Sequence, residues 1–434
     1  MRKSYTKKST RSRRKMNRFN PDQMQVQVAA GKASFQMVLP MGDLMLDVAS
    51  AIEQTASQAG ILMMKTMIDD EVEQLVGQRY AHQADRPGYR WGKEEGHVVF
   101  GGKKVAIEKP RVRSRDGQEM SLSRYQAFSN PRRLEHAVSN KILRRVSCRD
   151  YAGALDNLCE GYGIQKSSVS RKYKAASALR LEQLLQRRLD GLELTAIYLD
   201  GKEFADFTLI TAIGVDIEGR KHVLGFWPGA TETAEVCGRL LDDLIERGLR
   251  IDWRYLFVLD GSKALKKAVL HRFGSQTFIQ RCQVHKQRNV EGHLPDSQKR
   301  VFRMKYHAAL NMEDYAQARQ ELEKVHRWLM GVSEAAARSL EEGMEELLTV
   351  HRLKLPYELR KTLDNTNVIE SCFSVTSGMC RNVKRWRNET MACRWMGSAL
   401  LEAEKRFHRV RGYRQIPLLQ KALNQEIDKK TDVA

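Results

Sequence analysis

The sequence predicts a multidomain α/β protein whose centre is a mixed β-sheet. Two short apolar runs, residues 195–199 and 255–259, are rich in β-branched and aromatic residues, as is typical of strands buried on both faces. Between them lie two strand-like runs, 208–215 and 222–226, joined by a short turn, and then a helical pattern that Gly248 ends. This order predicts a sheet in which the first and last of these strands are neighbours.

Both buried runs end on an aspartate followed by glycine, Asp200-Gly201 and Asp260-Gly261. Carboxylates at the ends of adjacent strands lie close together, and open α/β sheets commonly bind ligands at that edge. Two anions so close repel each other unless they share a cation, and oxygen ligands favour Mg²⁺ or Mn²⁺. Asp-Gly is also a common turn signal, so two simple turns are the alternative.

The composition indicates a polyanion as the partner. The chain has 434 residues, enough for two to four domains, and a formal net charge of +21. Nine Lys and Arg residues precede the first acidic residue, Asp22, and the rest of the chain is basic too. We expect residues 1–35 to form a disordered basic arm that lies along phosphates, or alternatively only aids solubility.

The sequence gives no sign of a membrane or secreted protein. No run approaches the roughly 18 apolar residues of a membrane span, and the N-terminus lacks the apolar stretch of a signal peptide. The seven cysteines are odd in number and widely spaced, unlike a disulfide framework. These features predict a cytoplasmic protein with reduced thiols.

The first ordered region is predicted to combine helices with a hairpin. Apolar residues at helical spacing over 42–78 predict two helices joined near Gly60. Two short strands around Gly101-Gly102 then predict a β-hairpin, which continues into an extended basic segment around Pro110.

A helical region with a basic helix follows. Apolar residues line helices near 134–143 and 151–158, and glycines at 161 and 163 force a turn before a third helix. A helix, a glycine-containing turn and a basic second helix form a helix-turn-helix candidate, although helical hairpins without a DNA-binding role are common. The candidate DNA contacts on the third helix are Ser168, Ser170, Arg171, Lys172 and Lys174.

Three features follow Asp260. Cys282 and His285 have the Cys-x₂-His spacing of half a zinc site, but no second pair completes it, so a buried thiol with a hydrogen-bonded histidine is favoured. Residues 300–357 show helical periodicity and predict an inserted helical domain. Asn367 can cap a helix that carries Glu370 in its first turn, where an acid is often no more than a capping residue.

Residues 371–414 are strongly basic and contain Trp386 and Trp395. Basic side chains with interleaved aromatics suit a phosphate backbone and unstacked bases. The candidate DNA contacts here are Arg381, Lys384, Arg385 and Arg387.

Taken together, these motifs resemble the Mutator-type bacterial insertion-sequence transposases, a branch of the DDE recombinases with a ribonuclease-H-like core. The resemblance is carried by the two Asp-Gly motifs, by Gln280-Arg-Cys-Gln-Val-His285 with Arg288-Asn289, and by Asn367-Val-Ile-Glu370-Ser. Gly229-Ala-Thr-Glu232 between the aspartates and the N-terminal hairpin also look like the family. The likeness runs from about residue 60 to 415 and departs at Ser377, where relatives often carry a basic residue.

The resemblance implies an active site of three acids, Asp200, Asp260 and Glu370, holding two Mg²⁺ or Mn²⁺ ions. It also implies a supporting role for Cys282 and His285 beside that site. By analogy, Asp200 would bridge both ions, with Asp260 and Glu370 each holding one.

The resulting hypothesis is a DNA transposase that binds the terminal inverted repeats of its element and catalyses metal-dependent strand cleavage and transfer. We expect double-stranded DNA as the partner, at least a homodimer because two ends are joined, and association with the nucleoid. The alternatives are a ribonuclease-H-like nuclease or resolvase, and a catalytically silent, transposase-derived DNA-binding protein. The predicted divisions are the arm 1–35, N-terminal helices and hairpin 36–128, helix-turn-helix-like region 129–190, catalytic core 191–289, helical insertion 290–361, second part of the core 362–415 and C-terminal tail 416–434.

Overall fold

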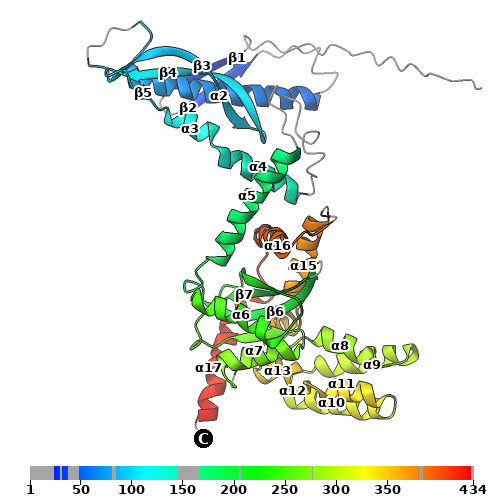
Figure 1. The fold of residues 1–434 in the computed structure, drawn as a ribbon. Coiled ribbons are helices and arrows are strands. Elements are labelled where there is room, and N and C mark those ends of the chain that lie inside the picture. The colour runs from blue at the N-terminus through cyan, green and yellow to red at the C-terminus, as the bar shows by residue number, and fades with distance from the viewer. Residues whose placement is uncertain are drawn as a thin grey trace, which may run out of the picture. The chain divides into compact units, whose positions relative to one another are not determined.

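The computed structural model describes residues 24–29, 32–37, 48–80, 85–144, 166–204, 207–275, 277–381, 383 and 385–431. The chain divides into two compact units (Figure 1). Unit 1 comprises residues 1–138 and 149–169, and unit 2 comprises 139–148 and 170–434.

Unit 1 is built on a long β-hairpin packed against a long helix. Its elements are β1 (Met24–Ala29), β2 (Lys32–Met37), α2 (Val48–Val76), β3 (Gly88–Phe100), β4 (Lys103–Ser114), β5 (Glu119–Met120), α3 (Ser123–Ser129) and most of α4 (Pro131–Leu143). Strands β3 and β4 pair in antiparallel register around Gly101 and Gly102, which both have positive φ, as a tight hairpin turn requires. The hairpin prediction is therefore confirmed, and β4 runs through Pro110 in an extended conformation as expected.

Two predictions for this unit are wrong. Residues 48–76 form one continuous helix, not two joined near Gly60, because Gly60 serves close packing: a Cβ there would lie 2.8 Å from the ring of Phe100. Residues 24–29 and 32–37 pair as antiparallel strands within what was predicted as a disordered arm that ends at residue 35. Residues 1–23 lie outside the described residues.

Unit 2 contains a five-stranded mixed sheet. In spatial order its strands are β10 (Phe278–Arg281), β9 (Leu256–Leu259), β6 (Leu194–Phe204), β7 (Phe207–Asp216) and β8 (Lys221–Gly229). Strand β6 pairs in parallel with β9 and antiparallel with β7, which confirms the expected mixed sheet with the two aspartate-bearing strands as neighbours.

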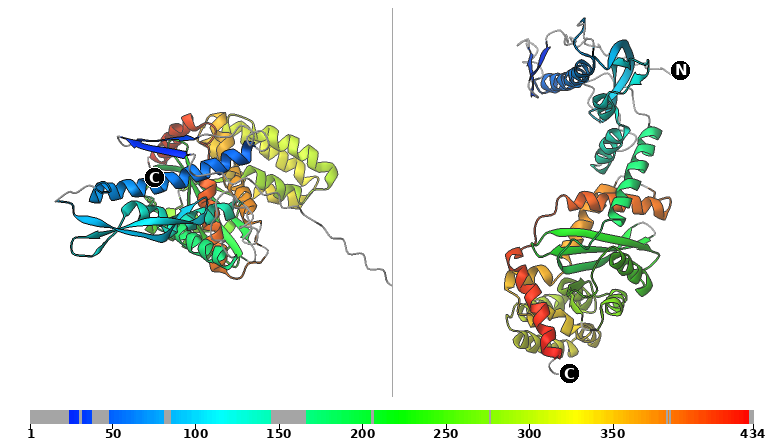
Figure 2. Two further views of the ribbon diagram at one scale, coloured as in Figure 1. Left: turned by 90° about the horizontal axis from the view of Figure 1, so that it is seen from above. Right: turned by 90° about the vertical axis from the view of Figure 1, so that its left-hand side faces the viewer.

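Helices cover both faces of this sheet. On one face, α6 (Ala234–Glu246) and α7 (Lys263–Phe273) pack against alternate strand residues, including Ile197 and Leu199. On the other, α15 (Asn367–Cys380) contacts β6, and α16 (Glu389–Glu404) contacts β8 (Figure 2, right). Because side chains alternate along a strand, Asp200 is directed to the face opposite α6 and α7.

The segment between β10 and α15 is helical, as predicted. It contains α8 (Gln283–Glu291), α9 (Asp296–Leu310), α10 (Tyr315–Met330), α11 (Glu334–Glu341), α12 (Met344–Leu347), α13 (Thr349–Arg352) and α14 (Tyr357–Leu363). Helices α9 to α11 share an apolar core of their own, which includes Phe302, Leu322 and Leu340. The last described element is α17 (Ile416–Thr431), a helix with buried Leu419 and Leu423 where the sequence indicated only a tail.

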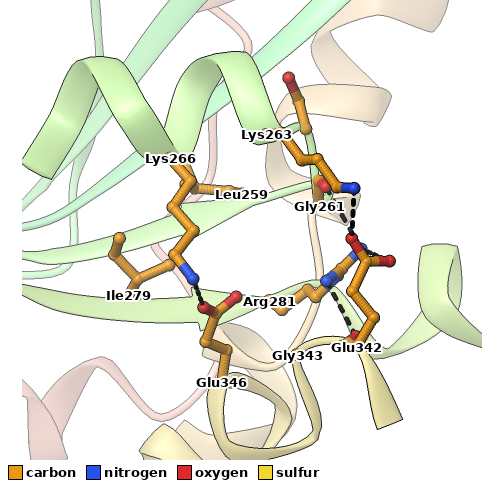
Figure 3. Close-up of a pocket in the computed structure, with 10 residues that line it drawn as sticks. Leu259, Gly261, Lys263, Lys266, Ile279, Arg281, Glu342, Gly343 and Glu346 are labelled. Carbon is orange, nitrogen blue, oxygen red and sulfur yellow. Dashed lines mark hydrogen bonds and ion pairs between the residues drawn. The ribbon is translucent and has the colours of Figure 1, made fainter. Parts of the chain in front are cut away.

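A polar latch, formed by Lys286 and Lys266, joins α11 and α12 to α8 and α7, the helices that follow strands β10 and β9. Lys286 is fully buried, and its ammonium donates to the carbonyls of Ser339, in the last turn of α11, and of Glu342, just after that helix, at 2.5 and 2.7 Å. Lys266 of α7 pairs with Glu346 of α12 across a cavity of about 250 Å³ (Figure 3). The insertion is therefore anchored through residues close in sequence to Asp260 and Cys282.

Candidate active site

The strand register brings the two predicted aspartates together. Leu199 of β6 pairs with Leu259 of β9, so Asp200 and Asp260 are each the next residue along adjacent parallel strands. Arg281 of β10 pairs with the same Leu259, and the next residue, Cys282, donates its N–H to the Leu259 carbonyl at 2.7 Å. Asp200, Asp260 and Cys282 thus lie at the same level along three neighbouring strands, β6, β9 and β10.

The two Asp-Gly motifs differ in structure. Asp260 follows the end of β9, and Gly261 adopts φ +110° at the turn into α7. Asp200, by contrast, lies within β6, and Gly201 continues the strand opposite Ile210 of β7. The expectation that each aspartate ends its strand is therefore wrong for Asp200, because β6 continues along β7 after its parallel partner β9 has ended.

Asp200 is a buried carboxylate that no described residue satisfies by a hydrogen bond or ion pair. Its side chain is only 5% exposed, and it forms no hydrogen bond or ion pair with any described residue. Burial, and next the charge of Asp260, raise the pKa of Asp200 to about 7, while His285 acts in the opposite direction. A buried anion of this kind is stabilised by a cation.

Glu370 comes to the site on the first turn of α15. The hydroxyl of Thr366, the residue just before the helix, donates to Glu370 Oε1 at 3.3 Å. Nε2 of His285 lies 3.3 Å from the same oxygen. The predicted cap is wrong: Asn367 is the first residue of the helix, and Asn365 Oδ1 accepts its N–H at 2.9 Å.

Cys282 and His285 belong to the same network. Sγ of Cys282 accepts the backbone N–H groups of His285 and Thr366, at 3.5 and 3.4 Å. The hydrogen bond with Cys282 is the main cause that raises the pKa of His285 to about 9, and the charges of Asp200 and Glu370 add to it. This matches the expected buried thiol with a hydrogen-bonded histidine.

Two residues near the acids have no role in the sequence-based prediction. Thr366 joins the Cys282–His285 pair to Glu370. The sequence did not indicate this role, because Thr366 and its partner Cys282 are 84 residues apart in the chain. Glu232, just before α6, lies over Gly201 and has its pKa raised by burial and by the charge of Asp260. The Gly229-Ala-Thr-Glu232 run was its only sequence signal.

The donor set has the chemistry of a divalent-cation site. Asp200, Asp260, Glu370 and Glu232 are oxygen donors of the type that Mg²⁺ and Mn²⁺ prefer, and Asp200 is buried without a partner. Among the described residues, no three His, Cys, Asp or Glu side chains already stand in a closed metal-ligand group. Mutual repulsion of carboxylates keeps them apart unless a cation lies between them. We therefore judge that the residues fit such an ion.

The predicted DNA contacts of the third helix lie on α5 (Lys166–Leu185). Ser170, Arg171 and Lys174 are exposed, and Ser168 and Lys172 are half-buried. Val169 and Tyr173 are buried, so this helix has a polar and an apolar side. The preceding helix of the predicted helix-turn-helix lies outside the described residues, and the motif stays a prediction.

The second predicted DNA-binding set follows α15. Arg381, Arg385 and Arg387 are exposed and form no ion pair with a described residue, whereas Lys384 lies outside the described residues. The nearby tryptophans are packed instead of open for stacking. Trp395 is 9% exposed against Tyr173, and the ring centroid of Trp386 lies 4.5 Å from that of Phe204.

No helix in the described part of the chain is long and apolar enough to span a membrane.

Comparison with known proteins identifies the relatives of this chain. The model of the Mutator family of transposases matches residues 44–410. The chain is 23% identical over 345 residues to the transposase for insertion sequence element IS256 in transposon Tn4001 of Staphylococcus aureus, covering 77% of this chain and 86% of that protein. It is 28% identical over 242 residues to the transposase for insertion sequence element IS6120 of Mycolicibacterium smegmatis, covering 54% and 72%.

A third relative is the transposase for insertion sequence element IST2 of Acidithiobacillus ferrooxidans, 30% identical over 207 residues that cover 46% of this chain and 66% of the relative. The family match covers most of the chain, including every residue of the candidate site, and the protein therefore belongs to the Mutator family of transposases.

Proposed function

We propose that this protein is a DDE-type DNA transposase with a ribonuclease-H-like core, which binds the terminal inverted repeats of its element and catalyses divalent-metal-dependent strand cleavage and strand transfer. The observation that carries the proposal is that Asp200 and Asp260 directly follow Leu199 and Leu259, the last paired residues of two adjacent parallel strands. Asp200 is buried there and has no hydrogen-bond or ion-pair partner among the described residues. Membership of a transposase family and the basic charge of the chain support it.

Asp200, Asp260 and Glu370 would hold two Mg²⁺ or Mn²⁺ ions. Such ions activate the attacking hydroxyl and stabilise the leaving oxygen in phosphodiester cleavage and transfer. His285 and Arg288 stand beside Glu370, with Arg288 Nη1 4.0 Å from its carboxylate. In this proposal the imidazolium of His285 orients Glu370 and adds positive charge where a scissile phosphate would bind.

The exposed basic side chains would bind the DNA. Those of α5 would contact the terminal repeats, and Arg381, Arg385 and Arg387 would contact phosphates next to the Glu370 helix. Because transposition joins two ends, the active form would be at least a dimer, associated with the nucleoid.

The test is a Mg²⁺-dependent cleavage and strand-transfer assay on linear DNA that carries the ends of the element. Wild type is compared with Asp200→Ala, Asp260→Ala and Glu370→Ala, and with Glu334→Ala, an exposed acid of the insertion, as the matched control. We expect joined products with wild type and the control, and a loss of at least a thousandfold in the three acid variants.

Other outcomes would contradict the proposal. Metal-dependent cleavage without joining would favour the nuclease or resolvase. Specific binding of the ends without either reaction would favour a silent DNA-binding protein.

A further inference from the structure

We propose that Glu232 is a fourth carboxylate ligand of the metal site, reaching it from the α6 side of β6. This inference rests on the proposed function, since it adds a ligand to the same pair of ions.

Gly201 provides the space for Glu232. A Cβ at position 201 would lie 2.5 Å from Oε2 of Glu232, so any larger residue would displace the carboxylate. Since Gly201 is an ordinary strand residue paired with Ile210, no turn requires a glycine here. The close approach of Glu232 is therefore a physical reason for a glycine after Asp200.

The Glu232 carboxylate is only partly satisfied. Its Oε2 lies over Gly201, and the nearby Ser262 side chain lowers the pKa of the carboxyl group against the larger effect of burial. Oε1 is buried and has no hydrogen-bond partner among the described residues. A buried carboxylate oxygen without a donor is costly, and a cation would relieve that cost.

Glu232 is connected to Asp260 through Ser262. The Ser262 N–H donates to Asp260 Oδ1 at 2.9 Å, and the side chain of the same serine lowers the pKa of Glu232. The serine thus joins one predicted metal ligand to the new one.

Asp200 provides an independent sign that a ligand is needed here. Its side chain is 5% exposed and has no hydrogen-bond or ion-pair partner among described residues. Asp200 and Glu232 lie on opposite faces of β6. The neighbouring strand β9 ends at Leu259, opposite Leu199, so beyond this point β6 has no paired strand on its β9 edge in the described part of the chain. A group at that edge can therefore be reached from both faces of the sheet. Two incompletely paired carboxylates therefore flank the open end of the β6–β9 pair.

The alternative is that Glu232 only holds Ser262 in position. Glu232→Gln separates the two roles, because glutamine keeps the size of the side chain and an oxygen that can interact with Ser262 but removes the charge. Glu235→Gln is the matched control, since Glu235 is exposed in the first turn of α6, three residues further along the chain, and pairs with Arg239.

The experiment is calorimetric titration of the metal-free, full-length protein with Mn²⁺, together with the Mn²⁺-induced shift of the melting temperature. We expect wild type and Glu235→Gln to bind two ions, and Glu232→Gln to bind one of them at least tenfold more weakly, with a smaller melting shift. A second variant, Gly201→Ala, should weaken Mn²⁺ similarly by displacing Glu232, whereas Gly191→Ala, with open space around it, should not.

The outcomes separate this inference from the proposed function. If Glu232→Gln binds Mn²⁺ as wild type does, Glu232 is not a ligand and the inference is overturned, while the three-acid site stands. If wild type itself binds no Mn²⁺ and cleaves no DNA, both the inference and the proposed function fail.

Discussion

Nε2 of His285 lies 3.3 Å from Oε1 of Glu370, so the histidine of the Cys-x₂-His motif contacts the third predicted acid directly. The motif thus belongs to the acid site.

This contact predicts a pH dependence of stability. The pKa of His285 is raised from 6.5 to about 9, so its charge stabilises the fold fully below pH 6.5, and that contribution is lost as the pH rises through 9. We expect the free energy of unfolding of metal-free protein to fall between pH 6.5 and 9, and His285→Gln to reduce this fall. Urea denaturation at three pH values measures this change in the unfolding free energy. The control is His307→Gln, since His307 is exposed. Equal pH slopes in His285→Gln and wild type would contradict the prediction.

Removing the buried charge of Asp200 is expected to stabilise the metal-free protein. Its folded pKa of about 7 lies above the ordinary 3.8, so stability falls as the pH rises from 3.8 through 7 and stays low above it. Asp200→Asn should therefore raise the free energy of unfolding at pH 8 by roughly 1 to 3 kcal/mol while abolishing cleavage. The exposed Asp296→Asn serves as control. A destabilised Asp200→Asn protein at pH 8 would refute this reasoning.

The stability of the polar latch between α8 and α11 should depend on Lys286. Lys286→Met leaves the carbonyls of Ser339 and Glu342 without their donor, at an expected cost of about 2 to 4 kcal/mol in unfolding free energy. Lys324→Met, which removes an exposed ion pair of the same insertion, should cost under about 1 kcal/mol. Denaturant titration compares the two, and similar losses would argue against the latch.

Arg381, Arg385 and Arg387 should contribute to DNA affinity without sequence preference. Each change to alanine is expected to weaken binding to any duplex and to lower the slope of log affinity against log salt by about 1 per lost phosphate contact. Fluorescence anisotropy over a salt series measures this slope. Arg338→Ala, an exposed and ion-paired arginine of the insertion, should leave it unchanged. An unaltered slope in all three variants would exclude these residues from the DNA interface.

The polar side of α5 should instead affect selectivity. Arg171→Ala and Lys174→Ala are expected to reduce the preference for terminal-repeat DNA over random DNA, by roughly 1 to 3 kcal/mol where a base contact is lost. Competition binding with the two DNAs gives the ratio, and Gln183→Ala, exposed on the same helix, is the control. A constant ratio in both variants would assign end recognition to another part of the chain.

Local patterns in the sequence predicted much of the fold. Short β-branched runs predicted β6 and β9, the paired glycines 101 and 102 predicted the hairpin turn, and Gly248 follows the end of α6 as expected. Each of these features depends on residues only a few positions apart. The same applies to the motifs that carried the family resemblance.

The tertiary structure decided what depends on distant contacts. Gly60 looked like a helix break, but the ring of Phe100 explains it as a packing site inside one helix. Gly201 looked like a turn residue, but the carboxylate of Glu232 explains it as a place of close approach. A glycine has the same sequence signature in either role, and only the neighbour that occupies the missing Cβ position distinguishes them. The sequence by itself determined which acids could form a site, and the register of β6, β9 and β10 determined that they meet.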